Sequence, residues 1–157
     1  TAVESGAQAA LLAPTEVLAR QHHASLSALL QPLQIEVGLL LGQGRTSAQK
    51  PDASQQNQAE PPPTQRSRKA TLAAMADGTL SLVVGTHALL SDTAVFKDLG
   101  VAVIDEQHRF GVRQRILLGE KGRNVDVMVM TATPIPRSLA MTAYGDLDHS
   151  QLDEKPV

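Results

Sequence analysis

The chain of 157 residues contains no cysteine and no tryptophan, and its only aromatic side chains are those of Phe96, Phe110 and Tyr144. Without cysteine it can form neither disulfide bonds nor thiolate metal sites. With so few aromatic residues, its core has to be built from Leu, Val, Ile, Ala and Met. Apolar residues make up 42% of the chain, which is enough for one domain of ordinary size.

The chain also lacks an excess of basic residues, since its formal net charge is -2. Any contact with nucleic acid must therefore come from a few placed groups or from parts of the protein outside this chain. No apolar run reaches the ~18 residues that a membrane span needs, and residues 1–8 do not resemble a signal peptide. We expect a soluble intracellular protein without a membrane partner. Because the first residue is Thr1 and not methionine, we also expect a fragment.

Short apolar runs alternate with helical patterns along the chain. Strands are predicted at residues 8–13, 35–41, 80–84, 101–104 and 127–130. Helices are predicted at residues 15–30, with Leu18, His22, Leu26 and Leu29 on one face, at residues 65–76, with Gly78 as the C-terminal cap, and at residues 136–144. The strands are continuously apolar, which is typical of strands buried on both faces. The pattern predicts an open, doubly wound α/β domain with a mainly parallel sheet and helices on both faces.

Residues 42–64 break this pattern. They are rich in Gln, Ser, Pro and Ala, with three consecutive prolines at 61–63. Such a segment cannot bury enough apolar surface to offset the entropy lost on ordering. We predict a disordered insertion within the domain and assign it no function.

Four groups of polar residues directly follow predicted strands. They are Pro14, Thr15 and Glu16; Gly85, Thr86 and His87; Asp105, Glu106, Gln107 and His108; and Thr131, Ala132 and Thr133, with Arg137 shortly after. In open parallel sheets, ligands bind beyond the carboxyl ends of the strands. The spacing therefore predicts one shared active edge.

The acidic pair Asp105 and Glu106 carries the clearest chemistry. In nucleotide hydrolases, the first acid at such a strand end holds Mg²⁺ and the second orients the attacking water. The ordinary alternative is two acids that begin a turn, and the pair alone favours neither interpretation.

The other three groups also have ordinary alternatives. Thr131 and Thr133 could bond the acidic pair or belong to a turn that caps the next helix. Thr15 could bind a DNA phosphate at a helix N-terminus or be a plain N-cap. Gly85, followed by hydroxyl and imidazole donors, could likewise be a strand-to-helix turn. His22 and His23 are adjacent on a predicted helix and point in different directions, so they make a poor metal pair and indicate a partly exposed helix surface.

The order of the four groups resembles motifs Ia, Ib/Ic, II and III of superfamily 2 helicases. Residues 85–90, 105–112, 130–137 and 140–148 are similar to those of the RecG-type helicases in particular. The nearest competing family is the transcription-repair coupling factor, in which the acidic motif usually reads Asp-Glu-Glu-His and Gly-Thr-His is usually followed by Lys. Gln107 and Ala88 therefore favour the RecG type.

The resemblance implies part of the first RecA-like P-loop motor domain of an ATP-dependent DNA helicase. It implies ATP and Mg²⁺ as cofactors, with Asp105 holding Mg²⁺, Glu106 activating water, and Gln107 and His108 sensing the nucleotide. Thr131, Ala132, Thr133 and Arg137 would couple this site to DNA. The DNA contacts implied are Pro14, Thr15, Glu16, Gly85, Thr86 and His87.

The implied partner is branched double-stranded DNA, such as stalled forks and Holliday junctions, in recombination and repair. The implied parent is a monomer in the bacterial cytoplasm, associated with the nucleoid. The alternatives are the coupling-factor motor and a non-catalytic nucleic-acid-binding or protein-interaction module of the same fold.

The phosphate-binding pattern Gly-x-x-x-x-Gly-Lys-Ser/Thr does not occur in the chain. The resemblance places that loop before residue 1 and an arginine finger after residue 157. The strand leading into the loop would fill the middle of the sheet, so its absence predicts two unpaired backbone ladders. We therefore expect residues 1–157 alone to be weakly stable and without ATPase activity.

Overall fold

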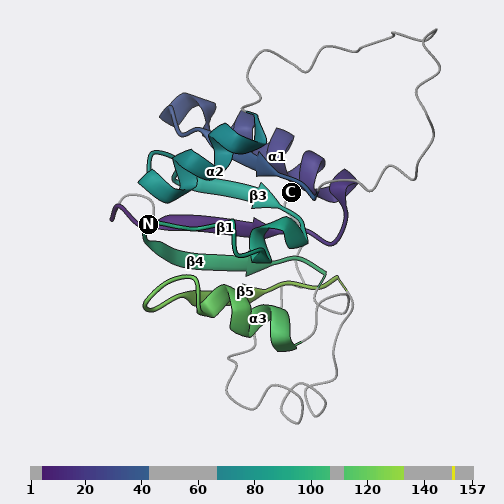
Figure 1. The fold of residues 1–157 in the computed structure, drawn as a ribbon. Coiled ribbons are helices and arrows are strands. Elements are labelled where there is room, and N and C mark those ends of the chain that lie inside the picture. Colours follow the sequence, from purple (N-terminus) through teal and green to yellow (C-terminus); the bar gives the residue numbers. More distant parts are fainter. Residues whose placement is uncertain (1–4, 43–66, 107–111, 133–149, 151–157) are drawn as a thin grey trace, which may run out of the picture.

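The five strands in the described part of the chain form one parallel sheet. The computed structural model describes residues 5–42, 67–106, 112–132 and 150. The strands are β1 (Gln8–Leu12), β2 (Val37–Leu40), β3 (Leu82–Gly85), β4 (Leu99–Ile104) and β5 (Asp126–Val129). They lie in the order β2-β3-β1-β4-β5, and every neighbouring pair is parallel, as the arrows of Figure 1 show. The predicted parallel sheet is confirmed.

Helices cover both faces of the sheet. They are α1 (Glu16–Leu30), α2 (Arg68–Asp77) and α3 (Val112–Gly119), with short 3-10 turns η1 (Gln31–Leu33) and η2 (His87–Leu90). Leu12 of β1 shares one core cluster with Met75 of α2 and Leu118 of α3. Leu11, its neighbour in the strand, shares the other cluster with Ala19 of α1. Since consecutive residues of a strand point to opposite faces, α1 lies on one face and α2 and α3 on the other, so the prediction of helices on both faces is confirmed.

The residues at the helix ends form the caps that their residue types favour. Thr15 is the N-cap of α1, and its hydroxyl oxygen accepts a hydrogen bond from the Leu18 backbone N–H at 3.2 Å. Ser67 caps α2 in the same way. Gly78 ends α2 with φ +81, the left-handed conformation that glycine adopts most easily. No helix in the described ranges is both long and apolar enough to cross a membrane.

The buried stripe of α1 differs from the prediction by one helical position. Leu29, predicted to face the sheet, is 70% exposed, whereas Leu30 packs against the core. The stripe is centred on Ala19, Leu26 and Leu30, which follow the helical repeat. Leu18 packs at the side of this stripe, so the row that it begins leaves the sheet at the last turn of the helix.

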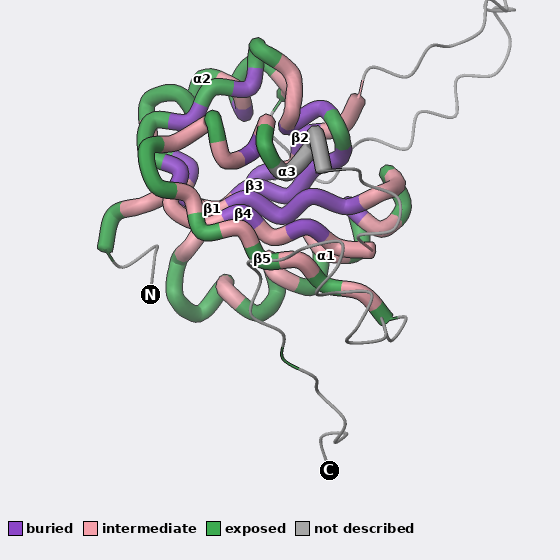
Figure 2. The backbone as a smooth tube through the Cα atoms, turned by 90° about the horizontal axis from the view of Figure 1, so that it is seen from below, coloured by how far each residue is buried: buried purple, intermediate pink, exposed green. Residues whose placement is uncertain are grey.

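The expected gap in the middle of the sheet is not there. β1 pairs with β3 on one side and with β4 on the other, so no ladder is open between β2 and β5 in the described part of the chain. The least buried strand is instead β5 at the edge, where Met128 is 57% exposed. Figure 2 shows the same contrast, with buried residues concentrated in β1 and β3.

Some predicted elements lie outside the described residues, and one helix was not predicted. The helix predicted at residues 136–144 lies outside, as does the insertion predicted at residues 42–64 except for Gly42. Helix α3 was not predicted. It begins at Val112, the last residue of the segment 105–112, which was interpreted only as a motif and not as secondary structure.

The side chain of Lys121 connects the turn after α3 to the loop after η2 by hydrogen bonds. Its ammonium donates hydrogen bonds to the backbone oxygens of Ser91, at 2.9 Å, and of Ala94, at 2.8 Å. Partial burial lowers the pKa of Lys121, and the negative charge of Asp92 opposes that shift.

The side chain of Gln8 holds the amino end of the sheet together. It is 3% exposed, and its amide nitrogen donates to the backbone oxygens of Met75 and Leu80. Its amide oxygen accepts from the backbone N–H groups of Lys97 and Asp98. One buried side chain thus bonds to the loop before β4, to the last turn of α2 and to Leu80, which lies two residues before β3.

We predict that Gln8→Leu destabilises the fold by roughly 3 kcal/mol, because removing the amide leaves buried backbone groups without partners. The measurement is urea unfolding, compared with the wild type. Gln21→Leu on the exposed side of α1 is the matched control and should change the free energy of unfolding by less than about 0.5 kcal/mol. Equal effects of the two substitutions would contradict the role given to Gln8.

Candidate functional site

The four polar groups predicted at strand ends do begin at one edge of the sheet. Leu12 pairs with both Gly85 and Ile104, and Ile104 pairs with Val129. Backbone hydrogen bonds continue one residue further: Ala13 N–H to Gly85 O at 2.8 Å, Asp105 N–H to Leu12 O at 2.9 Å, and Met130 N–H to Ile104 O at 2.8 Å. The residues that follow β3, β1, β4 and β5 therefore lie in one row.

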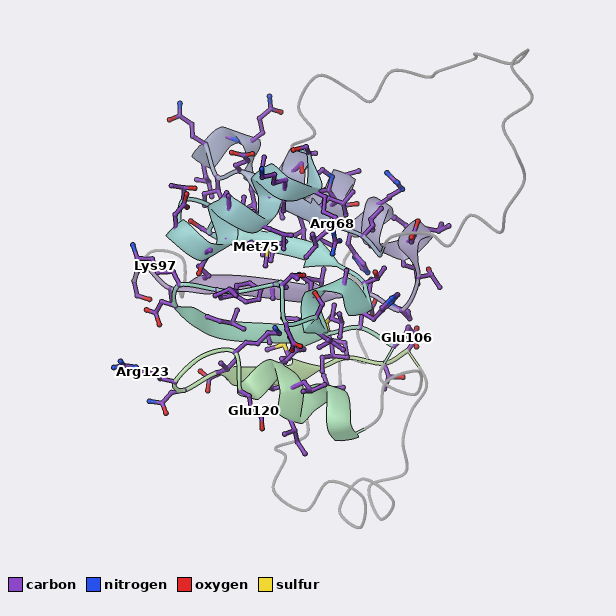
Figure 3. The ribbon with its side chains drawn as sticks, viewed as in Figure 1. Arg68, Met75, Lys97, Glu106, Glu120 and Arg123 are labelled. Atoms are coloured by element: carbon purple, nitrogen blue, oxygen red, sulfur yellow. The ribbon has the colours of Figure 1, made fainter. Side chains whose placement is uncertain are left out.

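The acidic pair stands at the end of β4. The Asp105 side chain is 17% exposed, and its Oδ2 lies 2.7 Å from Nε2 of His22. Glu106 has φ +52, a left-handed conformation that residues other than glycine adopt rarely and mostly where the surroundings impose it. Figure 3 shows Glu106 at the arrowhead end of the sheet, opposite to Lys97 and Arg123. Gln107 and His108 lie outside the described residues.

Pro14, Thr15 and Glu16 connect β1 to α1. Thr15 is the N-cap, so the ordinary interpretation of this hydroxyl holds. A hydroxyl that accepts one bond still has its own proton to donate, so capping does not prevent a second bond to an anion. Glu16 is exposed in the first turn of the helix.

Thr86 and His87 differ in what they present to solvent. Thr86 is 3% exposed, and its hydroxyl oxygen accepts a hydrogen bond from the Gly42 backbone N–H at 3.3 Å. His87 is exposed, and its ring lies so close to Gly42 that a Cβ on Gly42 would come within 3.2 Å of it. Thr86 therefore supports the loop, while His87 is the side chain that a ligand can reach.

Gly85 is required by the approach of β2. A Cβ at this position would lie 2.4 Å from the Leu40 carbonyl oxygen and 2.8 Å from Leu89 Cγ. The role of Gly85 is packing between strands, which places Thr86 and His87 after it.

The group after β5 is described only in part. Thr131 is partly buried and Ala132 is exposed, directly after the strand that borders β4. Thr133 and Arg137 lie outside the described residues.

His22 is the residue of this site that the sequence did not reveal. The two adjacent histidines do point in different directions: His22 contacts Asp105, and Nε2 of His23 lies 3.0 Å from the Val37 carbonyl oxygen. The described residues contain no group of three or more His, Asp or Glu side chains that could hold a metal ion. The contact with Asp105 spans 83 sequence positions, and no local pattern signals it.

The sequence that forms this site matches a known protein family. The model of the DEAD/DEAH box helicase family matches residues 2–142, which is most of the chain. The chain belongs to the DEAD/DEAH box helicase family.

Relatives of this helicase-family chain include the ATP-dependent DNA helicase RecG of several bacteria. The identity is 44% to RecG of Haemophilus influenzae, 47% to that of Acidithiobacillus ferridurans and 45% to that of Escherichia coli O157:H7. In each case the match covers 99% of this chain and 20% of the relative. The chain thus spans about one fifth of the length of these relatives.

Solved helicase structures share the fold. A structure of RecG bound to a three-way DNA junction has a TM-score of 0.64 and 36% identity, and the match covers 97% of this chain and 18% of that one. The helicase MrfA bound to DNA has a TM-score of 0.58 at 18% identity, over 92% of this chain and 20% of that one, and so is similar in fold alone. The predicted RecA-like helicase fold is confirmed.

We predict that Gly85→Ala in this helicase-family chain lowers the thermal unfolding midpoint by several degrees. Backbone that must move away from a new Cβ costs about 1–3 kcal/mol. Gly119→Ala is the matched control, because nothing lies within 4 Å of a Cβ there. If Gly85→Ala were as stable as Gly119→Ala, the close approach of Leu40 would be wrong.

Proposed function

We propose that this chain is part of the first motor domain of a RecG-type helicase, which hydrolyses ATP to translocate on and remodel branched double-stranded DNA. The observation that carries the proposal is the single row formed by the ends of β3, β1, β4 and β5. Identities of 44–47% to RecG proteins across 99% of the chain support it. The proposal includes a monomeric parent that acts at the nucleoid in the bacterial cytoplasm.

Membership of the helicase family implies the use of ATP, and we assign the nucleotide side of the row to β4 and β5. The carboxylate of Asp105 suits Mg²⁺, which prefers hard oxygen ligands and takes only one or two from protein when phosphates supply others. When bound with the nucleotide, the ion would neutralise charge on the phosphate oxygens. Asp105 is the described residue that would hold it.

In this proposal, Glu106 accepts a proton from the attacking water. The water oxygen forms a bond to the γ-phosphorus while the bond from that phosphorus to the bridging oxygen breaks, which releases ADP and phosphate. Glu106 lies next to Asp105 at a rigid strand end, where a general base has to be held. Gln107 and His108 would report the nucleotide state to Thr131, Ala132, Thr133 and Arg137.

We assign the DNA side of the row to β1 and β3. Thr15 can donate its hydroxyl proton to a phosphate oxygen, and the first backbone N–H groups of α1 face the same way. Pro14 and Glu16 flank this contact. At the end of β3, Gly85 and the buried Thr86 shape the loop, and the exposed His87 makes the contact. Such contacts go to phosphate and would be largely independent of base sequence.

The catalytic part of the proposal predicts that Glu106→Gln in the full-length protein leaves ATP binding intact. It should lower turnover by roughly 10²-fold or more, because the amide cannot accept the proton from water. Nucleotide binding and phosphate release are measured separately. Glu120→Gln is the control, since Glu120 is exposed at the end of α3 away from the row. Normal hydrolysis by Glu106→Gln would remove Glu106 from the mechanism.

The DNA part predicts that His87→Ala raises the dissociation constant for branched DNA about tenfold, and equally for unrelated sequences. The DNA-stimulated ATPase of the variant should fall at subsaturating DNA. The affinity for DNA should decrease as salt rises in both the wild type and the variant. Lys97→Ala is the control, because Lys97 lies at the opposite end of the sheet. Unchanged DNA affinity in His87→Ala would contradict the assignment.

A further inference from the structure

The contact between His22 and Asp105 joins α1 to the end of β4. His22 Nε2 lies 2.7 Å from Asp105 Oδ2, a short distance that is typical of a nitrogen donor with a charged carboxylate. In the tautomer that carries its hydrogen on Nε2, the imidazole donates this bond and the carboxylate oxygen accepts it. The two side chains are 31% and 17% exposed, so bulk water competes only in part for this bond.

Packing and backbone hydrogen bonds fix the positions of both His22 and Asp105. Helix α1 is fixed to the sheet by Ala19, which is fully buried, and by Leu26 and Leu30, which pack against the same cluster. Asp105 is fixed by its backbone N–H, which donates to the Leu12 carbonyl oxygen at 2.9 Å. The imidazole of His22 therefore approaches the carboxylate from a direction that is set by the position of α1 on the sheet.

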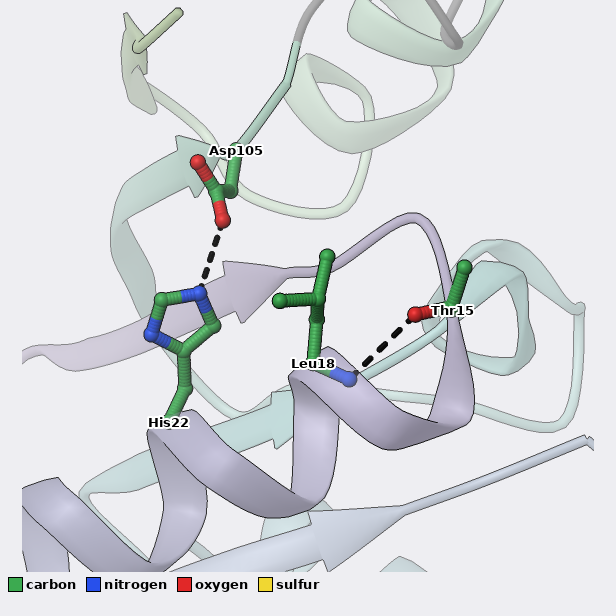
Figure 4. A network of polar contacts seen from close by, with 4 residues as sticks. All are labelled: Thr15, Leu18, His22 and Asp105. Carbon is green, nitrogen blue, oxygen red and sulfur yellow. Dashed lines mark hydrogen bonds and ion pairs between the residues drawn. The ribbon is translucent and has the colours of Figure 1, made fainter. Parts of the chain in front are cut away.

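A hydrogen bond to one oxygen restricts the rotation of the carboxylate. An aspartate at a strand end can otherwise turn about its two side-chain bonds and lose rotamer entropy when it binds a cation. With Oδ2 held by His22, the second oxygen is left for a ligand. Figure 4 shows that oxygen on the side of the Asp105 carboxyl group away from His22. Outer partners of this kind commonly orient the carboxylates that bind metal ions.

We propose that His22 is a positioning residue for Asp105, which fixes the carboxylate so that one oxygen faces the magnesium-bound nucleotide. This rests on the proposed function, in which Asp105 holds Mg²⁺. A purely structural role, in which His22 only fastens α1 to the sheet, makes a different prediction. In that case the loss of His22 would lower stability and leave the affinity for Mg²⁺ unchanged.

The test measures the binding of Mg²⁺ and not only catalysis. The full-length protein is titrated with MgCl₂ in the presence of a fluorescent, non-hydrolysable ATP analogue, and the Mg²⁺ concentration at half-maximal binding is recorded. His22→Leu should raise that concentration about 10- to 100-fold, the usual effect of losing an outer partner of a metal ligand. Binding of the analogue in EDTA should stay the same.

His22→Gln and His22→Asn make a matched pair. The glutamine amide nitrogen can reach the position of imidazole Nε2, whereas the shorter asparagine cannot. We expect Mg²⁺ binding close to that of the wild type in His22→Gln and weakened binding in His22→Asn. This pair keeps the test valid if His22→Leu fails to fold. Equal Mg²⁺ affinity in the two variants would overturn the proposal.

His23→Leu is the control for an adjacent imidazole on the same helix, since His23 bonds to a backbone carbonyl and not to Asp105. It should lower the unfolding midpoint without changing Mg²⁺ affinity, and an equal loss of Mg²⁺ affinity in His22→Leu and His23→Leu would overturn the positioning role. Asp105→Asn distinguishes a failure of the proposed function from a failure of the positioning role alone. If it leaves the Mg²⁺ dependence unchanged, the proposed function fails. If it weakens Mg²⁺ binding while His22→Leu does not, only the positioning role fails.

Discussion

The parallel register of β3, β1, β4 and β5 is the constraint on which the candidate site depends. Leu12 of β1 is aligned with the last residue of β3 and with Ile104 of β4, so the chain leaves the sheet at one level. With strands about 4.8 Å apart, four neighbouring ends span about 14 Å, and the ends of β3 and β4 lie two spacings, or about 10 Å, apart. That distance between the acidic pair and His87 is more than one side chain can reach, so the two halves of the site need an intermediate.

The two ends of the sheet are stabilised by different means. At the amino end, the buried amide of Gln8 bonds to four backbone groups, which closes that end with a satisfied polar network. At the carboxyl end, the backbone bonds of Ala13 and Asp105 extend the ladder by one residue only. Beyond it the backbone takes up the positive φ of Glu106. The buried polar network therefore stabilises the end of the sheet that lies opposite to the row of candidate site residues.

The sequence predicted the elements better than it predicted their contacts. Continuous apolar runs gave the five strands, and Thr15 and Gly78 marked helix ends, because these signals are local. The stripe of α1 was misplaced by one position, because Leu18 and Leu29 obey the helical period as well as Ala19 and Leu30 do, and periodicity alone does not distinguish the two rows. The strand order was not predicted either, because β1 pairs with both β3 and β4 and so closes the position that was expected to be unpaired in the middle of the sheet.

The meeting of His22 and Asp105 depends on this topology and so could not be foreseen. β1 lies directly beside β4, so the helix that follows β1 crosses the sheet within reach of the acidic strand end. Thr15 and His22 are separated by about two turns, or roughly 10 Å along the helix axis. Helix α1 thus begins at the proposed DNA contact and reaches the proposed magnesium ligand in its second turn. Helix α1 therefore connects the two proposed contacts, because Thr15 is its N-cap and its His22 bonds to Asp105.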